Sequence, residues 1–215
     1  MSPARQLGTA LRSEWARHRS ERYALWVVPG FYLIVLLLFG ALLGPWPDLL
    51  ARAAGAVVWS GASITLAACA GAMHRGALGD GSLQRWAASG RLMSLWSIGT
   101  IAVWGALCGA PLLVMGVLGM VSFAGWSPET EAVSLGLAIA LPGLLGLASL
   151  ASALGYGAGA LLQPLLILPL MLPSLILGVG AGSVPGVLWW LGALSVGQLL
   201  LGVALSALTL RAQID

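Results

Sequence analysis

The 215-residue chain contains no lysine and carries little charge of any kind. Only 8% of its residues are Asp, Glu, Lys or Arg, and all ten basic residues are arginines. A phosphate-binding P-loop uses a lysine to reach the β and γ phosphates of a nucleotide. The chain therefore cannot hydrolyse ATP with that machinery, and ATP-driven work would have to be powered by another chain.

Groups that bind metals or carry out catalysis are also scarce. Cys69 and Cys108 lie far apart in apolar runs without a Cys-x-x-Cys pair, which indicates buried small side chains. His18 and His74 each stand alone among arginines, and there is no Gly-x-Ser-x-Gly motif. The apolar runs contain none of the ionisable side chains that ion-coupled carriers use in the membrane. We predict no catalytic, cofactor-binding or metal-binding residue in this chain.

Apolar residues, in contrast, make up 59% of the chain, and the mean hydropathy is +0.96. Globular domains carry about 25% charged residues, so a soluble core of this size could not hide so much apolar surface. The apolar runs are continuous over about 20 residues, whereas the strands of a membrane barrel alternate over about ten. The sequence predicts an all-α, polytopic membrane protein.

Six transmembrane helices are predicted, within a single transmembrane domain over residues 1–215. They cover residues 24–43, 53–73, 92–120, 132–154, 161–180 and 187–210. The third apolar run continues to Phe123, which is longer than a crossing needs, so it is tilted, protrudes from the membrane or bends at Pro111. A glycine-rich connection at residues 155–159 precedes the fifth span.

The arginines are distributed unequally between the two sides that these spans define. One side has nine of them: Arg5, Arg12, Arg17, Arg19, Arg22, Arg75, Arg85, Arg91 and Arg211. The other side has Arg52, with Asp48, Glu129 and Glu131. Membrane proteins keep their positive charges in the cytoplasm, so both termini are predicted to be cytoplasmic. This placement also explains the net charge of +3 without nucleic-acid binding.

The N-terminal residues 2–22 are basic and amphipathic, and lack the features of a cleavable signal peptide. Leu7, Leu11 and Trp15 recur every four residues, which gives a helix one apolar stripe. This pattern favours a helix in the membrane interface, with its arginines toward headgroups and water. A soluble basic tail is the alternative.

The segment from His74 to Arg91 is the one internal stretch with clustered charge. Gly79 and Gly81 are expected to break the preceding helix, and Ser82 to cap a short new helix over residues 83–89 that Gly90 ends. Leu83, Trp86 and Ala87 would form its apolar face. A short amphipathic helix between two spans is suited to gripping a partner in the cytoplasm.

This organisation resembles the permease subunits of ABC-2-type transporters, in which a helix between spans two and three docks on a separate ATPase. Asp80-Gly81-Ser82-Leu83 is similar to the Gly-Ser/Thr-Leu signature of that coupling segment. More closely, the chain resembles the CcmB family of cytochrome c maturation. Three stretches carry that resemblance: residues 44–53 (GPWPDLLARA) followed by Trp59, residues 80–83, and residues 167–173 (ILPLMLP). The chain departs from the family in having one acidic residue, Asp80, before Gly-Ser-Leu.

The resemblance implies a partner-binding coupling helix made by Asp80, Gly81, Ser82, Leu83, Gln84, Arg85, Trp86 and Arg91. Leu83 and Trp86 are predicted to insert into the partner, with Arg85 and Arg91 at the rim. The implied partners are a CcmA-like ATPase, CcmC-like and CcmD-like membrane subunits and a periplasmic CcmE-like chaperone, in a bacterial inner membrane. A second permease copy or another membrane subunit is also expected.

Haem is the implied cargo of the complex, although the residues themselves display no haem site. Three functions remain open at this point. The chain is a permease subunit for haem export, a mechanical subunit that couples ATP hydrolysis to release of a haem-loaded chaperone, or an ABC-2 permease for another substrate.

Overall fold

The computed structural model describes residues 2–20, 22–155 and 162–214, and these residues form helices joined by short turns, without a β-strand among them. The predicted glycine-rich connection lies outside the described residues except for Gly155, as does the first predicted residue of the fifth span. The chain runs through α1 (Pro3–Ser20), α2 (Arg22–Leu43), α3 (Pro47–Cys69), α4 (Ala72–Gly79), α5 (Ser82–Ala88), α6 (Met93–Trp104), the π-helical turn η1 (Gly105–Gly109), α7 (Ala110–Ala124), α8 (Pro128–Leu154), α9 (Leu162–Val179), the 3₁₀ turn η2 (Gly180–Gly182) and α10 (Val187–Ala212).

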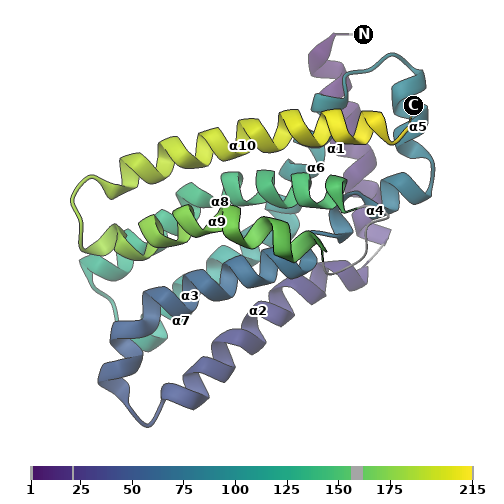
Figure 1. The fold of residues 1–215 in the computed structure, drawn as a ribbon. Helices are drawn as coiled ribbons and strands as arrows, with labels where there is room; N and C mark the ends of the chain where they lie inside the picture. The colour runs from purple at the N-terminus through teal and green to yellow at the C-terminus, as the bar shows by residue number, and fades with distance from the viewer. Residues whose placement is uncertain (1, 21, 156–161, 215) are drawn as a thin grey trace.

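Six of these helical stretches are long and apolar enough to cross a membrane. They are α2, α3 with α4, α6 with α7, α8, α9 and α10. The prediction of an all-α, six-helix, multi-pass membrane protein is confirmed. In Figure 1 the long helices lie side by side, while α1 crosses one end of them, where α4, α5 and both chain termini also lie.

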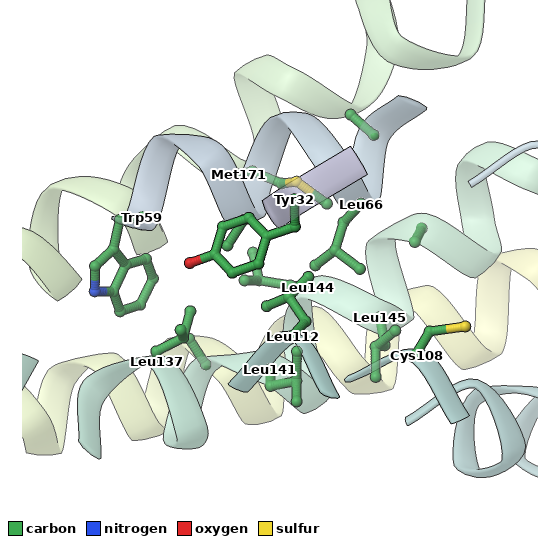
Figure 2. Close-up of a cluster of buried hydrophobic side chains, with 14 of the residues drawn as sticks. Tyr32, Trp59, Leu66, Cys108, Leu112, Leu137, Leu141, Leu144, Leu145 and Met171 are labelled. Carbon is green, nitrogen blue, oxygen red and sulfur yellow. The ribbon is translucent and has the colours of Figure 1, made fainter. Parts of the chain in front are cut away.

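Helix α8 is the centre of the bundle, since it packs against α3, α6, α7, α9 and α10. Most of its side chains are buried over its second half. Its residues Leu137, Leu141, Leu144 and Leu145 meet side chains from α2, α3, η1, α7 and α9 in one apolar cluster (Figure 2). A polar group inside the cluster is satisfied by backbone, since the Tyr32 hydroxyl donates to the carbonyl of Val58 at 3.1 Å.

Helices α8 and α10 approach each other closely enough for backbone contact. A Cβ atom added to Gly202 would overlap the backbone carbonyl of Gly146. One turn away, the amide of Gly143 donates to the Ser195 hydroxyl at 3.1 Å, and a Cβ on Gly143 would meet the Ser195 carbonyl oxygen at 2.7 Å. Small residues permit this approach, and inside a membrane such close packing is a main source of helix association.

The third span contains a widened turn just before Pro111. The amide of Ala110 donates to the carbonyl of Gly105, which is the five-residue spacing of a π-helix. Both halves of the span pack against α8, but α6 also packs against α1 and α10, whereas α7 also packs against α2 and α3. The sequence leaves a tilt, a protrusion and a bend at Pro111 as alternatives for this long run. The structure shows a change of helical geometry immediately before the proline.

Candidate functional site

The turn between α4 and α5 has the shape that its glycines predict. Helix α4 ends at Gly79, and Gly81 adopts a φ of 72°, a left-handed conformation that side-chain-bearing residues rarely take. Helix α5 then runs over Ser82–Ala88, one residue earlier than predicted, and Gly90 reverses the chain with a φ of 68°. The predicted short helix between spans two and three is therefore present.

The predicted cap of α5 is wrong in its residue. The cap position is Gly81, and the side chain that accepts the first free amide is Asp80, whose Oδ1 receives the Ser82 N–H at 2.8 Å. The Ser82 hydroxyl instead points into the chain and donates to the carbonyl of Ala77 at 3.3 Å. Asp80 takes the cap role because an aspartate side chain can accept a hydrogen bond from the backbone N–H two residues later in the chain.

The apolar face of α5 is turned toward its own chain. Leu83 is fully buried and Trp86 is 4% exposed. They share a cluster whose other buried members are Ala10, Ala77, Leu78, Met93, Trp96, Ala153 and Leu210. The prediction that Leu83 and Trp86 insert into a partner is therefore wrong, because these side chains already fill the space between α1, α4, α6 and α10.

Trp86 is fixed by three contacts. Its indole N–H donates to the carbonyl of Leu92 at 3.1 Å, and its ring meets the ring of Trp96 edge-on with centroids 5.2 Å apart. The guanidinium of Arg91 lies 4.8 Å above the Trp86 ring, in a cation–π arrangement. Arg91 thereby closes the outer side of the cluster and is held beside α5.

Arg17 of α1 ties this turn to the N-terminal helix. Its Nη1 donates to Glu14 at 2.9 Å, its Nη2 donates to the Ser82 hydroxyl at 2.8 Å, and its Nε lies 3.5 Å from Asp80. Glu14 is fully buried and the Arg17 side chain is 11% exposed, so the pair is screened little by water. A charged side chain from residue 17 thus determines where residues 80–82 lie.

Asp80 remains ionised at neutral pH in this setting. Its partial burial favours the neutral acid, but the hydrogen bonds from Ser82 and the charges of Arg17 and Arg85 outweigh that effect and hold the pKa of the Asp80 carboxyl below its usual value. The contribution of this carboxylate to stability is present above its unfolded pKa and is lost as the pH falls through the folded one.

The buried side of α1 differs from the apolar stripe that the sequence indicates. Trp15 is 46% exposed, whereas Ala10, Glu14 and His18 are buried against α6. The indole N–H of Trp104 donates to Nε2 of His18 at 2.8 Å. The stripe at residues 10, 14 and 18 has the same four-residue spacing, but two of its members are polar, so an apolar periodicity does not reveal it.

Both histidines have protein partners in the bundle. His18 accepts from Trp104, and the fully buried His74 places Nε2 2.9 Å from the Ser149 hydroxyl, while its backbone N–H donates to Ser152 at 3.0 Å. These bonds join α1 and α4 to the central helices α6 and α8. They give both histidines structural roles.

The outward face of α5 is polar and open. Gln84 and Arg85 are exposed, as is Ala88, and Asp80 is half-exposed beside them. Arg85 donates from Nη1 to the Asp80 carbonyl at 3.1 Å, which keeps its guanidinium over the turn. Of the predicted partner-binding residues, Asp80, Gln84 and Arg85 are exposed, whereas Gly81, Ser82 and Arg91 are partly exposed.

Replacing Leu83 with aspartate is expected to damage the chain itself rather than a docking surface. A buried, unpaired carboxylate costs several kcal/mol, so the cluster around α5 should open. Limited proteolysis of the purified chain should then cut within residues 74–91, while Gln84→Asp, on the exposed face of the same helix, should stay as resistant as the parent chain. Equal resistance of both variants would contradict the inward placement of Leu83.

Known proteins match the chain over nearly its whole length. A profile of the CcmB protein family matches residues 12–213. The heme exporter protein B of Escherichia coli K12 is 32% identical over 209 residues, 93% of each chain. That of Pseudomonas aeruginosa PAO1 is 31% identical over 174 residues, 77% of this chain and 78% of the relative. The matched region takes in all six spans and the segment around α5, and on this evidence the chain belongs to the CcmB family.

Proposed function

We propose that this chain is the membrane permease subunit of an ABC-type complex that exports or delivers haem for c-type cytochrome biogenesis. A separate ATPase supplies the energy, and haem is the cargo of the complex. The names of the matched relatives support haem as the cargo. The lack of any lysine for a P-loop supports ATP hydrolysis by a separate subunit. The complex would lie in a bacterial inner membrane, with the arginine-rich end in the cytoplasm.

The observation that carries the coupling part of this proposal is the two-sided character of α5. Its outward side chains, Gln84 and Arg85, are exposed, while its inward ones, Leu83 and Trp86, are packed into the bundle. A partner that moves the outward face therefore moves the packed face with it. Seven-residue helices are marginal by themselves, so α5 owes its position to these internal contacts.

Movement of α5 has two direct routes into the membrane-spanning helices. One runs through Ser82 and Arg17 to α1, and from His18 of α1 to Trp104 at the end of α6. The other runs through Trp86 to Trp96, in the first half of α6. Both routes end on the part of the third span that precedes its widened turn. We propose that ATP binding or hydrolysis in the partner displaces this half-span.

The further partners in this proposal are CcmC-like and CcmD-like membrane subunits, a periplasmic CcmE-like haem chaperone and a second copy of the permease. A single six-helix chain forms half of the usual membrane part of an ABC transporter, which supports the second copy.

A mechanical role without passage of haem is the second candidate. The burial of the two histidines and their bonds to Trp104 and Ser149 support this role. In this version the displacement of α6 releases the haem-loaded chaperone from a neighbouring subunit.

Deletion of the gene tests both candidates together, and reconstitution in liposomes then separates them. Removal of the gene is expected to abolish covalent haem staining of c-type cytochromes and to leave b-type cytochrome spectra unchanged; normal c-type maturation would contradict both candidates. Liposomes that hold the complete complex should move haem in an ATP-dependent manner if the chain is an exporter. Full ATP hydrolysis without haem movement, together with chaperone release, is the result expected of the mechanical subunit.

A further inference from the structure

An open cleft of about 770 Å³ lies beside α5 at the arginine-rich end of the bundle. Its walls come from α5, from the turn before α6 and the first residues of α6, and from the last turns of α10 and the residues after it. The residues that define it are Gln84, Arg91, Met93, Ala204, Leu208 and Arg211. Elements from distant parts of the chain thus form one concave site.

The charged side chains among the described lining residues of this cleft are two arginines. Arg91 and Arg211 reach it from opposite walls, and no Asp or Glu occurs among the described residues that line it. Arg91 is held in place by its stacking on Trp86. Two arginines on facing walls match an anion that is flanked on both sides, and arginine binds phosphate with paired N–H donors.

The cleft lies at the edge of the membrane-spanning region. Met93 begins the third candidate span, and Arg211 stands one residue before the end of the sixth. Most of the other lining residues are apolar, and α10 carries a row of exposed side chains, Leu201, Leu205 and Leu208, of which Leu208 lines the cleft. A ligand that fits both parts has an anionic head and an apolar body that extends into the bilayer.

We propose that this cleft binds an anionic phospholipid of the adjoining leaflet. Its phosphate lies between Arg91 and Arg211, and its acyl chains follow the exposed leucines of α10. Anionic headgroups gain about 1 kcal/mol from each arginine near the membrane surface, whereas a zwitterionic headgroup gains much less. The bound lipid then fills the space between α5 and α10 and braces α5 from the side opposite to Arg17.

Native mass spectrometry of the detergent-purified full chain tests this proposal. Phosphatidylglycerol and phosphatidylcholine with identical acyl chains are added separately, and the retained adducts are counted. We expect phosphatidylglycerol to be retained selectively, and the double variant Arg91→Gln with Arg211→Gln to weaken it by roughly thirtyfold, about fivefold for each arginine. Arg75→Gln, which removes an exposed arginine of α4 outside the cleft, is the control and should retain the lipid fully.

A second variant keeps the test decisive if loss of Arg91 disturbs α5. Ala204→Trp fills the cleft from α10 and leaves both arginines in place, so it should reduce retention of phosphatidylglycerol by at least fivefold. Equal retention of the two lipids, or unchanged retention in Ala204→Trp, would overturn the proposal. Displacement of the lipid by equimolar glycerol phosphate, or by haemin, would also overturn it, because the site would then select the phosphate group or the cargo and not a lipid.

Discussion

Replacing Gln84 and Arg85 together by glutamate is expected to lower recovery of the ATPase with this chain at least tenfold, with loss of holo-cytochrome c. Both side chains lie on the outward face of α5, and Arg85 donates to the exposed backbone carbonyl of Asp80. A docked ATPase surface without cations opposite these positions would desolvate two carboxylates without partners, which costs several kcal/mol. Affinity purification from membranes, with the ATPase quantified by immunoblot, measures the effect.

The matched control for this double variant is Arg75→Glu. Arg75 is exposed on α4, at the same end of the bundle, and does not belong to α5. The control should retain the ATPase, and both variants should reach the membrane at the parental level because neither disturbs a buried contact. Undiminished ATPase recovery with the double glutamate variant would rule out α5 as the docking helix.

Adding one methyl group at Gly202 is expected to destabilise the bundle severely. The Cβ of Gly202→Ala would overlap the backbone of Gly146, which cannot rotate away as a flexible side chain would. Overpacking of this kind costs about 1–3 kcal/mol, and here α8 and α10 must move apart along their tightest contact. Titration of the purified chain from mild detergent into dodecyl sulfate, followed by circular dichroism and tryptophan fluorescence, gives the free energy of unfolding.

Gly197 on the same helix provides the comparison, because a Cβ atom added there meets no atom within 4 Å. Gly197→Ala should leave the free energy of unfolding unchanged or raise it slightly, since alanine is the better helix former. If the two alanine variants unfold at the same point, the α8–α10 contact is looser than the structure places it.

The membrane architecture follows from the sequence because its signals are local. Continuous apolar runs predict six spans, and Gly79 and Gly81 mark the break before α5 without reference to any other part of the chain. The arginine asymmetry also places both termini at one end, and in the structure they do lie at the same end (Figure 1). The spans and the break before α5 depend on neighbouring residues, and the arginine asymmetry needs no knowledge of contacts between distant residues.

The site was harder to predict, because its decisive contacts join distant residues. An amphipathic helix needs something to cover its apolar face, but its periodicity does not say whether that cover is a partner or the same chain. Leu83 and Trp86 are covered by residues as far away as Ala10 and Leu210. The hydrogen bond from Arg17 to Ser82 likewise joins residues that are far apart in the sequence. Similarly, among 30 glycines nothing local singles out Gly146 and Gly202 as a contact pair.

The π-helical turn η1 acts on the third span as one inserted residue would. An α-helix advances by about 100° per residue, so the faces of α7 are rotated by roughly that angle from the positions that α6 would dictate. A single helical wheel drawn across Met93–Ala124 therefore assigns the wrong faces to one half of the span. Trp96 in α6 and Leu112 in α7 are both buried, although the two helices pack against different neighbours besides α8. Deleting one residue from Gly105–Gly109 would therefore restore a uniform α-helix and leave the buried faces of both halves toward their present neighbours.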